Sequence, residues 1–150
     1  WLSQPEIAEI IKEALLYRNG REYDLFAFCI MSNHVHVVFK PLESKSDWQS
    51  DLPTSSYTPL NKIMQSLKRH TARKANIILG REGTFWQDES YDHVIRDNGE
   101  FERIINYVLE NPVKAGLISK WEDWLWTFCK SDYQSDLLNP PQDGSQSRAC

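Results

Sequence analysis

The sequence predicts an α+β fold, because helical and strand-like patterns both recur along its 150 residues. Apolar residues return at helical spacing in three segments, at about 5–18, 59–79 and 99–111. Between the first two segments lies a run rich in β-formers, 23–39, which a short polar turn at 32–33 interrupts. Strands joined by so short a turn pair antiparallel. The expected framework is therefore a set of helices packed on an antiparallel sheet.

Length and composition indicate one soluble domain with no membrane segment. With 41% hydrophobic and 25% charged residues, the chain has the balance of an ordinary globular protein. No apolar run approaches the ~20 residues that cross a bilayer. The cysteines Cys29, Cys129 and Cys150 lack metal-type spacing, and we interpret them as reduced thiols of a cytoplasmic protein. We expect residues 1–135 to form the domain and residues 136–150 to form a disordered tail.

The first helix and the first strand have clear boundary signals. Ser3 and Glu6 form a capping-box pair, and Pro5 between them suits the first helical turn. Gly20 marks the end of this helix. The following run, 23–31, is apolar at adjacent as well as alternate positions, which indicates a central strand that is buried on both faces.

The second strand carries two histidines, His34 and His36, with one residue between them. Alternate side chains of a strand share a face, at a rise of ~3.3 Å per residue, so both imidazoles point the same way. Two imidazoles at this spacing can ligate one metal ion, although such pairs are also common on ordinary strand surfaces. Val35, Val37 and Phe39 form the opposite, apolar face, which can anchor the strand to a core. A metal site here requires a third ligand from elsewhere in the chain.

The helix that starts at Thr58-Pro59 is strongly basic. Between Pro59 and Arg81 the chain has no Asp or Glu, and its basic residues are Lys62, Lys68, Arg69, Arg73, Lys74 and Arg81. In a chain of net charge −4, this local excess of positive charge predicts a nucleic-acid-binding surface. A solvated helix face is the alternative interpretation.

The last helix brings a phenol and an amide together. We expect a strand at 93–96 and then, after a turn at 97–99, a helix that Pro112 ends. Tyr107 falls outside the apolar stripe of this helix, and Asn111, four residues later, is its neighbour on the helix surface. The pair can supply a nucleophile and a metal ligand, or it can be a boundary tyrosine and a helix-end residue.

Two motifs in this order resemble the paired signatures of the REP-associated tyrosine transposases, the single-tyrosine branch of the HUH endonucleases. They are Met31–His36 (MSNHVH) and Tyr107–Gly116 (YVLENPVKAG), with the phrases 85–87 and 91–96 between them. The resemblance covers about residues 3–128. It implies a ferredoxin-like α/β sandwich with an antiparallel sheet, from which the N-terminal strand of the family is missing in this chain.

The resemblance also implies an activity and a site. His34, His36 and Asn111 would ligate a divalent metal, Mg²⁺ or Mn²⁺, and Tyr107 would be the nucleophile. The enzyme would cleave and rejoin single-stranded DNA at hairpin, REP-like sequences through a 5′-phosphotyrosine intermediate. It would act as a monomer or a homodimer.

Two alternatives remain open at this point. One is a nucleic-acid-binding relative on the same fold that does not cut. The other is a metal-dependent phosphoesterase that activates water, for which Glu110 is the nearest candidate general base.

Overall fold

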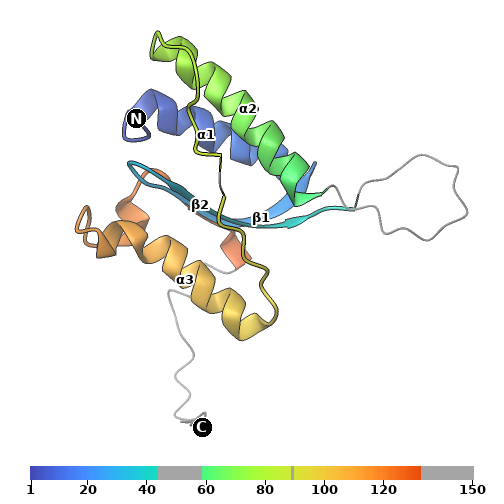
Figure 1. Cartoon of the computed structure of the whole chain (residues 1–150). Helices are drawn as coiled ribbons and strands as arrows, with labels where there is room; N and C mark the ends of the chain where they lie inside the picture. Colours follow the sequence, from blue (N-terminus) through green and yellow to red (C-terminus); the bar gives the residue numbers. More distant parts are fainter. Residues whose placement is uncertain (44–58, 89, 133–150) are drawn as a thin grey trace, which may run out of the picture.

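The computed structural model, shown in Figure 1, describes residues 1–43, 59–88 and 90–132. Its elements, in chain order, are α1 (Pro5–Arg18), β1 (Tyr23–Ile30), β2 (Val35–Pro41), α2 (Leu60–Ile78), α3 (Asn98–Lys114), the 3-10 helix η1 (Trp121–Asp123) and β3 (Thr127–Cys129). The strands form one antiparallel sheet in the order β2-β1-β3. The predicted α+β fold is confirmed, with a sheet of three strands among the described residues.

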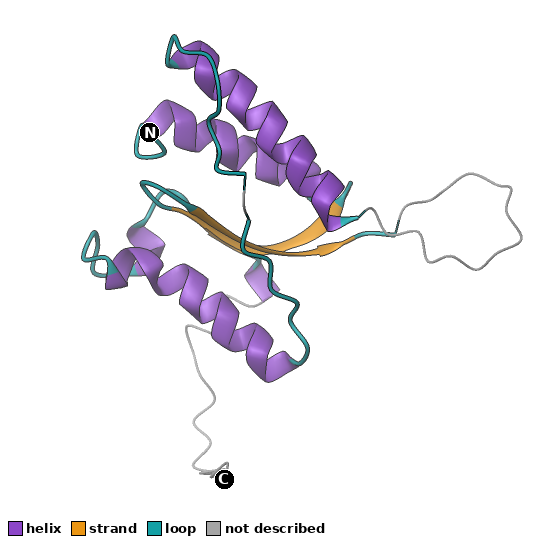
Figure 2. Cartoon of the chain, viewed as in Figure 1, coloured by secondary structure: helices purple, strands orange, loops and turns teal. Residues whose placement is uncertain are grey.

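Helices cover both faces of this sheet (Figure 2). The helices α1 and α2 lie on one face, and α3 lies on the other. Each face has its own apolar cluster, one built around Ile11, Leu15 and Leu67 and the other around Ile105 and Leu109. The sheet therefore separates α2, which carries the predicted basic surface, from α3, which carries the predicted nucleophile.

The central strand β1 is buried on both faces, as its sequence predicted. Its register against β2 shifts between Leu25 and Ala27, so that one extra residue is inserted in β1. This bulge lets Leu25 and Phe28 both pack on the α1–α2 side, while Ala27 and Cys29 pack on the α3 side. Every one of these side chains is completely buried.

The strand β2 keeps its alternation without a break. Val35, Val37 and Phe39 pack on the α1–α2 cluster, and Val38 packs on the α3 cluster. Since His36 shares the parity of Val38, its side chain faces α3. The predicted apolar anchor of the histidine strand is thus confirmed.

Three local predictions need correction. The N-cap of α1 is Gln4 and no side chain caps it, so the Ser3 capping box does not form; Pro5 already occupies the first helical turn. Residues 93–96 form no strand. The Arg96 backbone N–H donates to the Glu100 side chain at the start of α3, at 2.8 Å, and so is not free to pair with a strand.

The helix α3 does not end at Pro112 but continues to Lys114. A proline in the last turn of a helix removes only one backbone hydrogen bond, and the Pro112 ring is buried here.

The predicted ends of α1 and α2 and the predicted start of α3 hold. Gly20 and Gly80 follow α1 and α2 with positive φ angles of 77° and 59°, a conformation that glycine adopts without steric cost. Asp97 is the N-cap of α3 and accepts from the Glu100 backbone N–H at 2.8 Å. No helix in the described ranges is long and apolar enough to span a membrane. The predicted tail at 136–150 lies outside the described residues.

Candidate active site

The histidine pair lies at the hairpin turn between β1 and β2. The Met31 backbone N–H donates to the His34 carbonyl at 2.8 Å and closes this turn, and β2 begins one residue later. The two imidazole rings have centroids 4.6 Å apart and planes inclined at 80°. The pair therefore shares one face of the sheet, although His34 precedes the strand rather than lying in it.

The helix α3 brings Tyr107 and Asn111 to the same face. Ile105, Val108 and Leu109 bury the inner side of the helix, which leaves the Tyr107 side chain 49% exposed. The Tyr107 ring contacts the His36 ring at a centroid distance of 5.5 Å with an edge-to-face inclination of 76°. The four residues that the motifs singled out thus come together from a turn, a strand and a helix.

Hydrogen bonds orient two of the candidate ligands. Asn111 Nδ2 donates to the Tyr107 carbonyl at 2.7 Å, so the amide oxygen is the end that can face His36. The Asn33 side-chain oxygen pairs with His34 Nδ1 at 2.7 Å. The lone pair of the other ring nitrogen, His34 Nε2, is then the one that can ligate a metal ion. Sequence reasoning missed this role of Asn33, although its position next to His34 in the motif was the available signal.

The surroundings of His36 favour its neutral form. Burial lowers the pKa of His36, and the nearby His34 lowers it further, while a hydrogen bond with the Asn111 side chain raises it in part. A neutral imidazole is the form that ligates a metal ion. Its Nε2 is buried and has no hydrogen-bond partner among the described residues. A buried nitrogen without a partner is costly, and a bound cation would satisfy it.

These donors fit a divalent cation. Two imidazoles and one amide oxygen, with no thiolate, suit Mg²⁺ or Mn²⁺ when substrate and water complete the coordination. Within the described part of the chain, no group of three or more His, Cys, Asp or Glu side chains could hold a metal ion.

The six predicted DNA-binding cations do not join this cluster. They belong to α2 and the turn after it, on the opposite face of the sheet. Two of them already have intramolecular partners: Lys68 Nζ donates to the Gln87 carbonyl at 2.8 Å, and Arg81 lies 3.9 Å from the centroid of the Trp1 ring. Those that remain exposed are Lys62, Arg69, Arg73 and Lys74.

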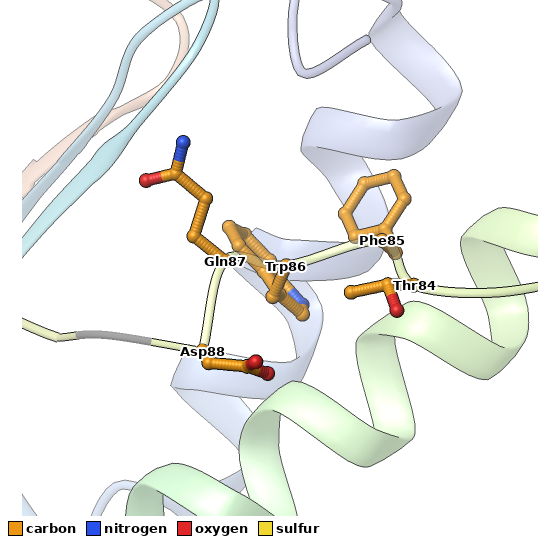
Figure 3. Close-up of a pocket in the computed structure, with 5 residues that line it drawn as sticks. All are labelled: Thr84, Phe85, Trp86, Gln87 and Asp88. Atoms are coloured by element: carbon orange, nitrogen blue, oxygen red, sulfur yellow. The ribbon is translucent and has the colours of Figure 1, made fainter.

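A shallow pocket lies beside α2, in the connection that leads towards α3 (Figure 3). It is lined by residues 84–88. Trp86 points into the α1–α2 layer, where its Nε1 donates to Thr71 Oγ1 at 2.9 Å, and Phe85 meets it edge to face at 5.1 Å. None of the lining residues belongs to the His–Tyr cluster. These contacts fix the connection to the helical layer.

The fold and the site define a class of protein: an α+β domain in which a histidine pair on a sheet faces a helix that carries a tyrosine.

Two curated proteins with similar sequences are named as members of a tyrosine transposase family. The chain is 24% identical over 121 residues to a Haemophilus influenzae protein named "Putative REP-associated tyrosine transposase". It is 21% identical over 117 residues to an Escherichia coli K12 protein named "REP-associated tyrosine transposase". The alignments cover 81% and 77% of this chain.

These relatives confirm the resemblance that the two motifs predicted. The chain spans 66% and 61% of the lengths of the two curated relatives. No family model matches the chain. No solved structure matches it either.

Proposed function

We propose that this protein is a metal-dependent transposase that cleaves and rejoins single-stranded DNA through Tyr107. The contact between the Tyr107 and His36 rings, at 5.5 Å, is the observation that carries the proposal. It sets a half-exposed phenol against two imidazoles and an amide, which is the arrangement that attack on a phosphodiester requires. The names of the two relatives support DNA transposition as the purpose of that chemistry.

The chain's own residues account for the chemical step as follows. The Tyr107 oxygen attacks the phosphorus atom, the bond to the 3′ oxygen breaks, and a 5′-phosphotyrosine with a free 3′-hydroxyl results. The phenol loses its proton, and the leaving 3′ oxygen gains one. Because a 3′-hydroxyl can attack the phosphotyrosine in turn, the product is a rejoined strand and not a digested one.

The remaining residues of the cluster position the reaction. His34, His36 and Asn111 would hold Mg²⁺ or Mn²⁺, which, when bound, polarises the phosphate as a Lewis acid. His36 is fixed by β2 and Asn111 by α3, so the docking of the helix on the sheet assembles the ligands and the nucleophile together. We further propose hairpin, REP-like DNA as the substrate; the term "REP-associated" in the relatives' names supports a REP-like sequence.

The test is covalent capture of DNA. Purified protein, Mn²⁺ and a labelled hairpin oligonucleotide with single-stranded flanks should yield a protein–DNA adduct that survives denaturing electrophoresis. Tyr107→Phe removes only the nucleophilic oxygen and should abolish the adduct. Tyr91→Phe is the matched control, because Tyr91 is 96% exposed and should leave the adduct unchanged.

Two outcomes distinguish the alternatives. Cleavage that persists in Tyr107→Phe would contradict the covalent mechanism and favour a phosphoesterase that activates water. Salt-sensitive binding without any cleavage by the unaltered protein would favour a relative that binds nucleic acid without cutting it.

A further inference from the structure

We infer that Lys114 binds a phosphate of the DNA strand that lies at Tyr107, so that the outer face of α3 holds a phosphodiester-binding site. This inference rests on the proposed function, because it assumes that DNA approaches Tyr107. It adds to the four-residue cluster a cation that neither the charge pattern nor the motif histidines indicated.

The helix itself brings Lys114 to the site. Tyr107, Asn111 and Lys114 follow one another at i, i+4 and i+7, so at ~100° per residue they share one face of the helix. Helical side chains lean towards the N-terminus, which directs the long Lys114 side chain back over Asn111. In the structure Lys114 Nζ lies 5.1 Å from the centroid of the Tyr107 ring.

The Lys114 ammonium is available to a ligand. Lys114 is exposed, and its side chain forms no ion pair with a carboxylate among the described residues. It lies instead against the face of the Tyr107 ring, a weak contact at an exposed site. A phosphate carries a full negative charge, so it is a stronger partner for an ammonium than an aromatic ring is.

The six basic residues of α2 and the turn after it cannot supply this charge. They lie on the far face of the sheet, whereas Lys114 belongs to the helix that carries the nucleophile. A lysine at the end of a helix also interacts favourably with the helix dipole, and Lys114 lies in the last turn of α3. The experiment must therefore separate phosphate binding from a purely structural role.

Reversible binding provides this test. In a Tyr107→Phe background, which prevents covalent attachment, the dissociation constant of a fluorescent single-stranded hairpin oligonucleotide is measured over a range of salt concentrations. Lys114→Met should weaken binding about tenfold, as the removal of one charge-assisted hydrogen bond does. It should also reduce the magnitude of the log–log salt slope by ~0.7, the value for one phosphate contact on a single strand.

Two matched variants complete the design. Lys120→Met removes the same charge from an exposed lysine beyond the end of α3 and should leave binding and slope unchanged. Lys114→Arg keeps the charge and should retain most of the affinity. Thermal unfolding midpoints that stay well above the assay temperature in every variant exclude an effect through unfolding, even where Lys114→Met loses its small interaction with the helix dipole.

The outcomes distinguish the two proposals. If Lys114→Met binds DNA with the same affinity and salt slope as Lys120→Met, Lys114 binds no phosphate, whatever the adduct assay gives. If Lys114→Met loses affinity while the unaltered protein forms no adduct, the phosphate site stands and the proposed strand transfer fails. If no variant binds the oligonucleotide, both proposals fail.

Discussion

At the scale of single residues, the hydrogen bond between Asn33 and His34 explains how an exposed histidine can serve as a ligand. An imidazole on a turn rotates freely unless its other nitrogen is held. The 2.7 Å contact between Asn33 Oδ1 and His34 Nδ1 orients the ring and favours the tautomer with its proton on Nδ1. His36 is held instead by the strand, by its own burial and by a hydrogen bond with the Asn111 side chain.

We predict that Asn33→Ala weakens Mn²⁺ binding about tenfold or more, the range found when a metal ligand is deprived of its hydrogen-bond partner. Isothermal titration calorimetry with MnCl₂ measures this directly. Ser32→Ala, a change in the same turn, is the control and should have no effect. Equal Mn²⁺ affinity in Asn33→Ala and the unaltered protein would show that Asn33 does not position His34.

At the scale of elements, the contact between α1 and β1 depends on a buried tyrosine. Tyr23 is completely buried, and its hydroxyl donates to the Leu15 carbonyl at 2.8 Å, which joins the helix to the central strand. Burial raises the pKa of Tyr23 above its ordinary value, while the charge of Arg18 partly opposes this. The neutral phenol is therefore part of the folded state.

We predict that Tyr23→Phe lowers the free energy of unfolding by about 1 kcal/mol at neutral pH, the typical contribution of one hydrogen bond. Because the pKa of Tyr23 is raised on folding, its stabilising contribution is complete below the unfolded pKa of about 10 and is lost as the pH rises beyond it. Urea unfolding at pH values on either side of 10 should show a smaller alkaline loss in Tyr23→Phe. An identical alkaline loss in both proteins would contradict this.

The buried thiols Cys29 and Cys129 also make the free energy of unfolding depend on pH in the alkaline range. Burial raises the pKa of Cys129 to about 11 and also raises that of Cys29. Both therefore lose their contribution to stability as the pH rises above the ordinary thiol range, in Tyr23→Phe and the unaltered protein alike. The difference between the two proteins isolates Tyr23.

The elements also show what sequence patterns can and cannot predict. Period-two alternation placed Val35, Val37 and Phe39 in the core and thereby directed His36 towards α3. The bulge in β1 had no such signal, because that strand is apolar at every position around it. The short strand β3 has no clear signal for a similar reason: its pairing with β1 depends on tertiary packing, as in the stacking of Phe28 on Phe128 at 5.5 Å.

Part of the candidate site could likewise be predicted from the sequence, and part could not. The shared face of His34 and His36, and the neighbourhood of Tyr107 and Asn111, follow from local periodicity and were predictable. The meeting of the two pairs was not, because they are more than about seventy residues apart and the packing of α3 on the sheet joins them. Only the resemblance to a family indicated that the two pairs belong to one site; periodicity along the sequence did not.

At the scale of the whole molecule, positive charge lies on both sides of the sheet. The exposed cations of α2 occupy the face opposite Tyr107, so one short strand of DNA cannot easily reach both. In a hairpin with a flanking single strand, the duplex stem is stiff but the flank is flexible, so the two parts can lie on different faces of the domain. We therefore expect the α2 surface to bind DNA without taking part in the chemical step.

We predict that replacing Lys62, Arg69, Arg73 and Lys74 with glutamine weakens DNA binding. The magnitude of the salt slope should fall by ~0.7 for each single-strand phosphate that these side chains no longer neutralise. Adduct formation at saturating DNA should continue, because Tyr107 and its neighbours are unchanged. Fluorescence anisotropy and the adduct assay measure the two effects. Affinity and salt slope equal to those of the unaltered protein would show that DNA does not bind α2.

The central claim is that Tyr107 becomes covalently joined to DNA, and mass spectrometry of the digested adduct tests it most directly. After incubation with Mn²⁺ and the hairpin oligonucleotide, followed by nuclease and trypsin, the peptide containing Tyr107 should carry a 5′-linked nucleotide. The corresponding peptide from a reaction without metal should be unmodified. A nucleotide found on another tyrosine, such as Tyr91, or cleaved DNA with an unmodified Tyr107 peptide, would contradict the account.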